Sequence, residues 1–279
     1  MSRKKETALE NTIVQGDCVE VLARERERRG GPFADLIFAD PPFNIGYAYD
    51  QYRDEVPYEE YVAWTRRWME ACREVLAAHG SMWIAMGDDY AAEVRMIGRE
   101  MGLVLRNWIV WYYTFGQQTK KKFARSHTHI LYFVQDAKGF IFDDEAVRVP
   151  SARQTTYHDR RAHPRGRIPD DTWILRPGEF PQAFGSDEDT WCFSRVCGTF
   201  KERAGFHGCQ MPEKLLERII VTASEPGQFV LDPFSGSGTT VVVAALLGRR
   251  YLGVELSEDY VRESLRRLKE ARTLFDARV

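Results

Sequence analysis

Two short motifs, each directly after an apolar run typical of a buried strand, constrain the fold of this chain most. Asp40-Pro41-Pro42-Phe43 follows the run at 35–39, and Asp232-Pro233-Phe234-Ser235-Gly236-Ser237-Gly238-Thr239-Thr240 follows the run at 228–231. If the two runs are neighbouring parallel strands, their carboxyl ends meet in the crevice where open α/β sheets bind ligands. Two segments far apart in sequence then form one site.

The rest of the chain alternates between the hydrophobic periodicities of strands and helices. We expect strands at 12–16, 35–39, 81–86, near 103–113, 128–134, 229–231 and 251–254, and helices at 18–29, 58–78, 89–101, 212–224, 239–247 and 258–274. A long irregular stretch to about 205 interrupts this alternation. The pattern predicts an α/β fold with a doubly wound, mostly parallel sheet.

The Asp-Pro-Pro-Phe motif has the chemistry needed to activate an exocyclic amino group. The lone pair of such a group on adenine or cytosine is delocalised into the ring, so attack on a methyl sulfonium requires hydrogen-bond acceptors for the amino hydrogens. Asp40 offers a carboxylate and Pro41 a carbonyl, while consecutive prolines stiffen the turn. Phe43 offers a flat face for an extruded base. We therefore predict Asp40, Pro41, Pro42 and Phe43 as catalytic residues; the alternative is an ordinary strand-ending turn.

The second motif is a glycine turn of the kind that lets a nucleoside approach the backbone. Gly236 and Gly238 permit torsions and contacts that a Cβ would forbid, and a helix begins near Gly238. Glu255 follows the glycines by about 20 residues, the spacing at which a carboxylate meets ribose hydroxyls. The turn lacks the glycine spacing of a pyrophosphate site. S-adenosylmethionine, which has a ribose and no phosphate, suits it.

With these motifs in this order, the chain resembles the β group of DNA amino-methyltransferases, the permuted arrangement in which the catalytic motif precedes the cofactor motif. Residues 11–18, 80–85 and 207–218 also carry the resemblance. It implies a seven-stranded, Rossmann-like methyltransferase sheet, base flipping, and S-adenosylmethionine as cofactor. The chain departs from the family at Met211, where Lys is common, and at Phe43, where Tyr is commoner.

The glycine turn and the resemblance together imply a cofactor site drawn from several parts of the chain. Its predicted members are Asp17, Cys18, Asp40, His207, Gln210, Pro212, Asp232, Phe234, Gly236, Ser237, Gly238, Thr239, Thr240 and Glu255. The resemblance also implies two regions. Residues 1–114 and 206–279 form the catalytic and cofactor-binding core, and residues 115–205 form an inserted target-recognition region that includes the core strand near 128–134.

The charge distribution indicates a DNA-binding stretch that the net charge hides. The formal net charge is −2, yet residues 116–168 contain eleven Lys and Arg against five Asp and Glu. A local basic stretch is the electrostatic signature of phosphate binding. The predicted DNA-binding residues are Lys120, Lys121, Lys122, Arg125, Arg153, Arg160, Arg161, Arg165 and Arg167. For each of them the alternative is a solvated surface charge.

Composition argues against several other classes. No apolar run approaches the ~18 residues of a membrane span, and the first residues do not form a signal peptide, so we expect a cytoplasmic protein without a membrane partner. The five cysteines are scattered and form no close pairs, which suggests neither zinc nor a disulfide framework. His127 and His129 alternate along a strand, but no third ligand accompanies them in sequence, so no metal is expected.

The leading hypothesis is a sequence-specific methyltransferase acting on the N6 of adenine in double-stranded DNA. Cytosine N4 is the alternative, because both reactions need the same acceptors. Cytosine enzymes of the family more often carry Ser at the position of Asp40, so the Asp indicates adenine. The motif order and the arginine-rich insert disfavour methylation of structured RNA or of a protein glutamine. The intact motifs disfavour a DNA-binding module without catalysis. The resemblance also suggests a homodimer and a cognate restriction endonuclease as partners.

Overall fold

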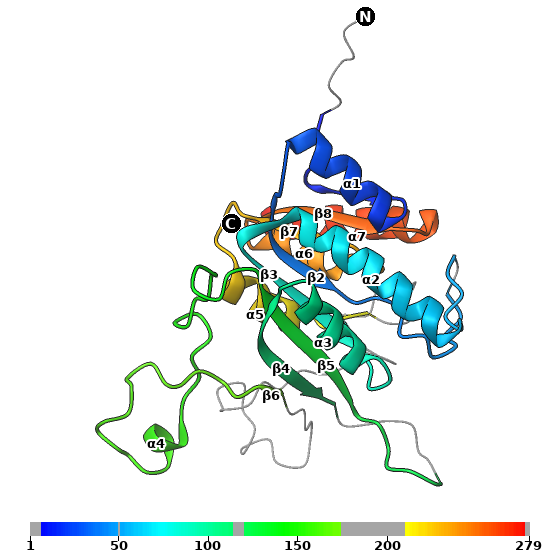
Figure 1. Cartoon of the computed structure of the whole chain (residues 1–279). Helices are drawn as coiled ribbons and strands as arrows, with labels where there is room; N and C mark the ends of the chain where they lie inside the picture. The colour runs from blue at the N-terminus through cyan, green and yellow to red at the C-terminus, as the bar shows by residue number, and fades with distance from the viewer. Residues whose placement is uncertain (1–6, 50, 114–119, 174–209, 277–279) are drawn as a thin grey trace, which may run out of the picture.

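One mixed sheet forms the centre of the molecule in the computed structural model, which describes residues 7–49, 51–113, 120–173 and 210–276 (Figure 1). Its strands are β1 (Thr12–Gln15), β2 (Ala34–Ala39), β3 (Leu76–Met86), β4 (Val104–Tyr112), β5 (His127–Val134), β6 (Thr172–Trp173), β7 (Phe229–Asp232) and β8 (Arg250–Glu255). Across the sheet they lie in the order β1-β8-β7-β2-β3-β5-β4-β6.

The strand directions confirm the predicted α/β class with a mostly parallel sheet. β1, β8, β7, β2 and β3 pair in parallel, while β5 lies antiparallel between β3 and β4. The seven predicted strands are all present. The two-residue β6, which pairs parallel with β4, adds an eighth that the sequence pattern did not predict.

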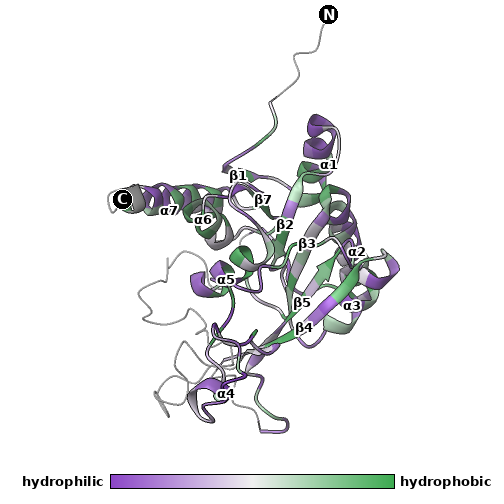
Figure 2. Cartoon of the chain, turned by 90° about the vertical axis from the view of Figure 1, so that its left-hand side faces the viewer, coloured by the Kyte–Doolittle hydropathy of each residue, from purple (hydrophilic) through white to green (hydrophobic). Residues whose placement is uncertain are grey.

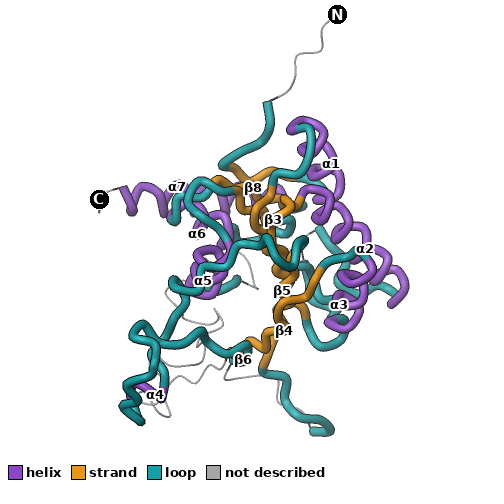
Figure 3. Tube along the Cα trace, turned by 60° about the vertical axis from the view of Figure 1, so that its left-hand side comes forward, coloured by secondary structure: helices purple, strands orange, loops and turns teal. Residues whose placement is uncertain are grey.

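Helices cover both faces of the sheet, as a doubly wound fold requires. α1 (Cys18–Arg29), α2 (Tyr58–Val75) and α3 (Ala91–Glu100) lie on one face, and α5 (Glu213–Ala223), α6 (Thr239–Leu246) and α7 (Glu258–Asp276) on the other (Figure 3). None of the helices in the described part of the chain combines the length and apolarity needed to cross a bilayer.

Each layer of helices closes its own hydrophobic core against the sheet. In Figure 2 the central strands β3 and β5 are largely in the hydrophobic colour, while α2 and α7 alternate between hydrophilic and hydrophobic colours. On the α2 face, Trp68 and Val94 pack with Ile37 of β2. On the α6 face, Ile219 and Val242 pack with Phe38 of the same strand. β2 is therefore buried on both sides, which is why its sequence is continuously apolar instead of alternating.

The prediction for the helix at 58–78 was wrong at its end. α2 stops at Val75, because Leu76 already pairs with Ala34 of β2 and begins β3. The register shifts between this pair and the next, Leu36 with Ser81, so that residues 77–80 form a bulge. Helical periodicity in the sequence cannot reveal this change, since the apolar residue at 76 satisfies either pattern.

The inserted region contains little regular structure. The described part after β5 holds the one-turn helix α4 (Ala152–Thr155) and β6, and its α4 loop extends beyond the β4–β6 edge of the sheet (Figure 1). An antiparallel bridge between Val149 and Arg167 closes this loop. Ion pairs of Arg148 and Arg165 with Glu145 also hold this loop together.

Candidate active site

Four parallel strands deliver the predicted site residues to one edge of the sheet. β2 ends at Ala39, directly before Asp40, and β7 ends at Asp232. β8 ends at Glu255, and β1 is followed by Gly16 and Asp17. Because parallel strands share a carboxyl edge, these segments meet, as the position of the two motifs predicted.

A pocket, here called the glycine-turn pocket, lies at this edge. Of the residues predicted to hold a cofactor, it is lined by Asp17, Cys18, Asp40, Asp232, Phe234, Gly236, Ser237, Thr239, Thr240 and Glu255. Gly238, Gln210 and Pro212 are not among the lining residues. His207 lies outside the described residues. Tyr52, Trp64 and Tyr260 also line the pocket, and no signal in the sequence identified Trp64 or Tyr260 as site residues.

Glu255, at the end of β8, holds the glycine turn through a hydrogen bond to its backbone. Its carboxylate accepts hydrogen bonds from the backbone N–H of Gly236 at 2.9 Å and of Ser257 at 2.9 Å. On the other side of the turn, the Arg267 guanidinium donates to the Ser237 carbonyl at 2.9 Å and to Thr239 Oγ1 at 2.9 Å. The turn is thus fixed by side chains from β8 and α7 as well as by its glycines.

Glycine was expected at position 238 because it lets a ligand approach the backbone, but the structure gives a different reason. Gly238 has φ +75° and precedes α6, in a conformation that most residues avoid. A Cβ there would lie 2.9 Å from Ser264 Cβ of α7. Ser264 in turn donates to the Gly236 carbonyl at 2.8 Å. Close packing of α7 against the turn therefore accounts for this glycine.

The catalytic turn predicted at Asp40 lies between two pockets. A second pocket, the catalytic-turn pocket, is lined by Asp40, Pro41 and Phe43. Asp40 also lines the glycine-turn pocket, so it forms part of the wall between the two pockets. The hydroxyl of the buried Tyr61 donates to the Pro42 carbonyl at 2.5 Å and fixes the turn from α2. The Pro42 carbonyl is thereby engaged inside the protein, while Pro41 faces the catalytic-turn pocket.

The far wall of the catalytic-turn pocket comes from residues that the sequence analysis did not connect with the turn. Trp111 and Tyr113 come from the β4 end, Arg125 and His127 from the start of β5, and Asp88 from the turn after β3. The antiparallel pairing of β5 with both β3 and β4 brings these three segments together. Only the sheet order, which a single sequence does not give, could have placed them here.

A polar cluster around Asp88 shapes this wall. Asp88 Oδ1 lies 2.8 Å from His127 Nε2 and 2.9 Å from His129 Nε2. Arg125 contacts Asp88 Oδ2 through Nε at 3.0 Å and donates to both carboxylate oxygens of Asp89 at 2.6 and 2.7 Å. This structure therefore provides the third residue that was missing beside the two histidines in sequence.

The hydrogen bonds of His129 do not suit a metal ligand. Trp108 Nε1 donates to His129 Nδ1 at 2.9 Å, and an indole nitrogen can only donate. Nδ1 must then be unprotonated, and Nε2 carries the proton that faces Asp88. A ligating Nε2 needs the opposite tautomer, with Nδ1–H donated to an acceptor. Burial also lowers the pKa of His129 below its usual range.

Most of the predicted DNA-binding arginines are engaged in ion pairs within the protein. Arg153 and Arg161 both pair with Asp159, at 2.6 and 3.0 Å, and these arginines lower the pKa of that carboxyl. Arg167 pairs with Asp170. Arg125 is held by Asp88 and Asp89.

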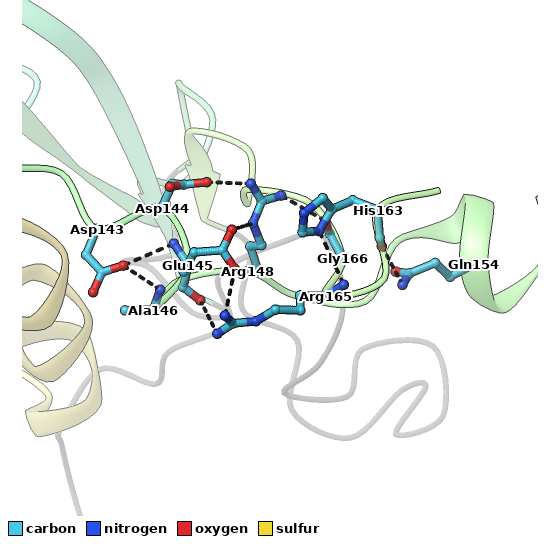
Figure 4. Close-up of polar contacts among 9 residues, drawn as sticks. All are labelled: Asp143, Asp144, Glu145, Ala146, Arg148, Gln154, His163, Arg165 and Gly166. Carbon is cyan, nitrogen blue, oxygen red and sulfur yellow. Dashed lines mark hydrogen bonds and ion pairs between the residues drawn. The ribbon is translucent and has the colours of Figure 1, made fainter. Parts of the chain in front are cut away.

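Figure 4 shows the network that engages Arg165 and organises the loop around it. Arg165 Nη1 contacts Glu145 Oε2 at 2.9 Å, and Arg148 contacts both Glu145, at 2.9 Å, and Asp144. Residues 140–171 contain six Arg and six Asp or Glu, so this part of the insert is formally neutral. The exposed Lys120, Lys121 and Lys122 lie on the loop that leads to Arg125, and Arg160 is exposed on the insert.

Comparison with known proteins agrees with this arrangement. Residues 34–266 match a family model described as a DNA methylase. Type II methyltransferase M.HpaI of Haemophilus parainfluenzae is 32% identical over 244 residues, which cover 87% of this chain and 70% of that protein. DNA adenine methyltransferase YhdJ of Escherichia coli K12 is 33% identical over 266 residues, covering 93% of this chain and 83% of the relative.

Solved structures share the fold at lower sequence identity. The cytosine-N4-specific PvuII DNA methyltransferase superposes with a TM-score of 0.64 at 18% identity, covering 97% of this chain and 93% of that one. A complex of M1.HpyAVI with SAM gives a TM-score of 0.60 at 18% identity, covering 92% and 98%.

Asp232 gives a pH-dependent prediction. Burial raises its pKa to about 7, with the Glu255 charge adding to the effect. The folded state thus retains a proton that the unfolded state loses near pH 4, so stability falls as pH rises toward 7. We expect Asp232→Asn, which resembles the protonated form, to raise the free energy of unfolding at pH 8 by on the order of 1–4 kcal/mol and to have little effect at pH 4.

Urea unfolding of both proteins at several pH values between 4 and 8 measures this difference. The exposed Asp259→Asn controls for the loss of one carboxylate. A stabilisation by Asp232→Asn that is equal at all pH values would contradict the raised pKa.

Proposed function

Since this chain belongs to the DNA methylase family, which comprises N6-adenine and N4-cytosine methyltransferases, we propose that it transfers the methyl group of S-adenosylmethionine to the N6 of adenine in duplex DNA. One observation carries the proposal. Asp40 lines both the glycine-turn pocket and the catalytic-turn pocket, so that a single carboxylate adjoins a cofactor site and a base site.

The glycine-turn pocket suits S-adenosylmethionine in charge. The described residues that line it include the carboxylates of Asp17, Asp40 and Glu255 and no Lys or Arg. Such a lining favours a cation with ribose hydroxyls over a phosphate-bearing nucleotide. When bound, the cofactor supplies an electrophilic methyl group on its sulfonium sulfur.

The catalytic-turn pocket suits an extruded base. A base must leave the duplex stack before its amino nitrogen can reach a methyl donor. Phe43 would cover one face of that base. The Asp40 carboxylate and the Pro41 carbonyl would accept its two amino hydrogens, directing the nitrogen lone pair toward the glycine-turn pocket. Tyr61 supports this role indirectly, because it engages the neighbouring Pro42 carbonyl and holds the turn in place.

The choice of adenine rests on sequence similarity. YhdJ, a DNA adenine methyltransferase by name, is 33% identical to this chain over most of both proteins. The cytosine-N4-specific PvuII enzyme shares the fold at 18% identity. Cytosine N4 is therefore the second candidate, with the same residues in the same roles.

We further propose that residues 1–114 and 206–279 form the catalytic core and that residues 115–205 select the DNA sequence. The position of the α4 loop beyond the sheet edge and the exposed lysines at 120–122 support this division. A homodimer, a cognate restriction endonuclease and a cytoplasmic location stay predictions of the sequence.

The first prediction from this proposed function concerns Asp40 and the target base. We expect Asp40→Asn to lower methyl transfer to duplex DNA by about 10²–10³-fold, because an amide accepts more weakly and presents a competing donor. The assay is mass spectrometry of nucleosides after digestion of the methylated DNA. N6-methyladenine is expected as the product. N4-methylcytosine alone would overturn the base assignment, and near-normal turnover by the variant would overturn the role of Asp40.

The second prediction concerns Glu255. We expect Glu255→Gln to weaken S-adenosylmethionine binding by roughly 1.5–3 kcal/mol, since a charged acceptor is lost both to the ligand and to the glycine turn. Isothermal titration calorimetry measures the affinity. The exposed Glu258→Gln is the matched control. Equal affinities of the two variants would place the cofactor elsewhere.

The third prediction separates the lysines from the ion-paired arginines. Each phosphate contact steepens the salt dependence of DNA binding. We expect Lys120→Ala with Lys121→Ala to reduce the slope of log K against log salt by about 1.8. Arg153→Ala with Arg161→Ala, which removes the same charge, should reduce it less, because Asp159 competes with phosphate for both guanidinium groups. The opposite ranking would show that DNA displaces Asp159.

A further inference from the structure

A buried carboxylate organises the segment that follows the catalytic turn. Asp54 is only 3% exposed. Its Oδ1 accepts the backbone N–H of Asn44 at 2.6 Å, and its Oδ2 accepts those of Ile45 at 3.1 Å and Tyr47 at 2.9 Å. The Asp54 carbonyl accepts the fourth, from Gly46, at 2.6 Å. Four consecutive backbone donors thus converge on one residue.

Asn44 closes the same loop at its base. Its side-chain amide donates to the Val56 carbonyl at 2.9 Å and to the Tyr90 hydroxyl at 2.8 Å, while its Oδ1 accepts from Val56 N–H at 2.8 Å. Its backbone has φ +57°, a left-handed conformation that Asn tolerates better than most residues. The loop beginning at Asn44 and ending at Val56 is therefore closed by side chains that bond to its own backbone.

The anchored loop carries tyrosines to both pockets. Tyr47 lines the catalytic-turn pocket, and Tyr49 lines both cavities. The two rings lie 4.8 Å apart. Further along the loop, the Tyr52 ring lies 5.4 Å from Trp64, which lies 5.7 Å from Phe234 of the glycine turn. Aromatic contacts thus connect the loop with the second motif across α2.

We propose that Asp54 is a positioning residue, which holds the 44–56 loop so that Tyr49 forms a wall shared by the two pockets. The inference builds on the proposed function, because the loop would then enclose the extruded base and the methyl donor on the side opposite the sheet. Asp54 touches neither pocket and acts through the backbone of residues 44–47. Loss of its carboxylate leaves three donors without their acceptor, and Tyr49 loses its fixed position.

The substitution Asp54→Asn tests this role, with Glu55→Gln as the control. The two residues are adjacent in sequence, but Glu55 is exposed. An amide at 54 keeps one acceptor oxygen and turns an NH₂ group toward backbone donors. We expect kcat/KM for DNA to fall by about 10–100-fold in Asp54→Asn, the scale of a small misplacement of reacting groups, and to stay unchanged in Glu55→Gln.

Tyr49→Ala provides an independent variant at a partly exposed site. It should reproduce the loss seen in Asp54→Asn, and the double variant should lose little more, because both changes remove the same wall. Tyr49→Phe should retain most activity, since it keeps the ring. A purely structural role of Asp54 would lower thermal stability without this agreement. Additive losses in the double variant would overturn the proposal.

Limited chymotrypsin digestion tests the anchor without any assay of methyl transfer. Cleavage sites are identified by mass spectrometry of the fragments. Cleavage after Tyr47 and Tyr49 should accelerate in Asp54→Asn and stay slow in the wild type and in Glu55→Gln. If the wild type methylates no DNA, the proposed function fails, while this digestion still tests the anchor. Equal digestion of all three proteins would refute the positioning role.

Discussion

The pairing of β2 with β7 is the contact on which the site depends. Leu36 lies opposite Val230 and Ile37 opposite Leu231, and this register brings Asp40 and the glycine turn to the same edge. Asp35 secures it at the other end of the strands. Its carboxylate accepts the Phe229 N–H at 2.6 Å and lies 2.7 Å from His79 Nε2 of β3. A slip of one residue would move Asp40 by about 3.3 Å and turn its side chain to the opposite face.

Carboxylates that hold backbone N–H groups recur around both pockets. Asp17 caps α1 through Val19 N–H at 2.9 Å, Glu255 holds Gly236, and Asp54 holds the loop after the catalytic turn. In each case a fixed charge determines the path of a turn beside a pocket. Turns built this way depend less on apolar packing, which suits segments that must leave room for ligands. The acidic lining of the glycine-turn pocket is partly a product of this construction.

The sequence predicted the elements and most residues that line the glycine-turn pocket, because both depend on local signals. Apolar runs identified the strands, and the motifs after 39 and 231 identified which strand ends line the two pockets. It could not predict that Trp111, Arg125 and Asp88 form the far wall of the catalytic-turn pocket, since their proximity follows from antiparallel pairing of β5. Nor could it show that Arg153 is paired with Asp159, because a count of charges does not say which are neutralised by neighbours. The end of α2 was misjudged for a related reason, since the strand partner of Leu76 is distant in sequence.

The pairing of β1 with β8 has a consequence for how the chain is made. Asn11 N–H donates to the Tyr251 carbonyl at 2.7 Å, and Gly16 N–H to the Glu255 carbonyl at 2.9 Å. On the ribosome, the first strand therefore emerges long before the strand that completes it. Early residues that line the glycine-turn pocket, such as Asp17 and Cys18, acquire their neighbours only after β8 has been synthesised. The glycine-turn pocket is therefore complete only once β7 and β8 have been synthesised, so ligand binding must follow the synthesis of these two strands.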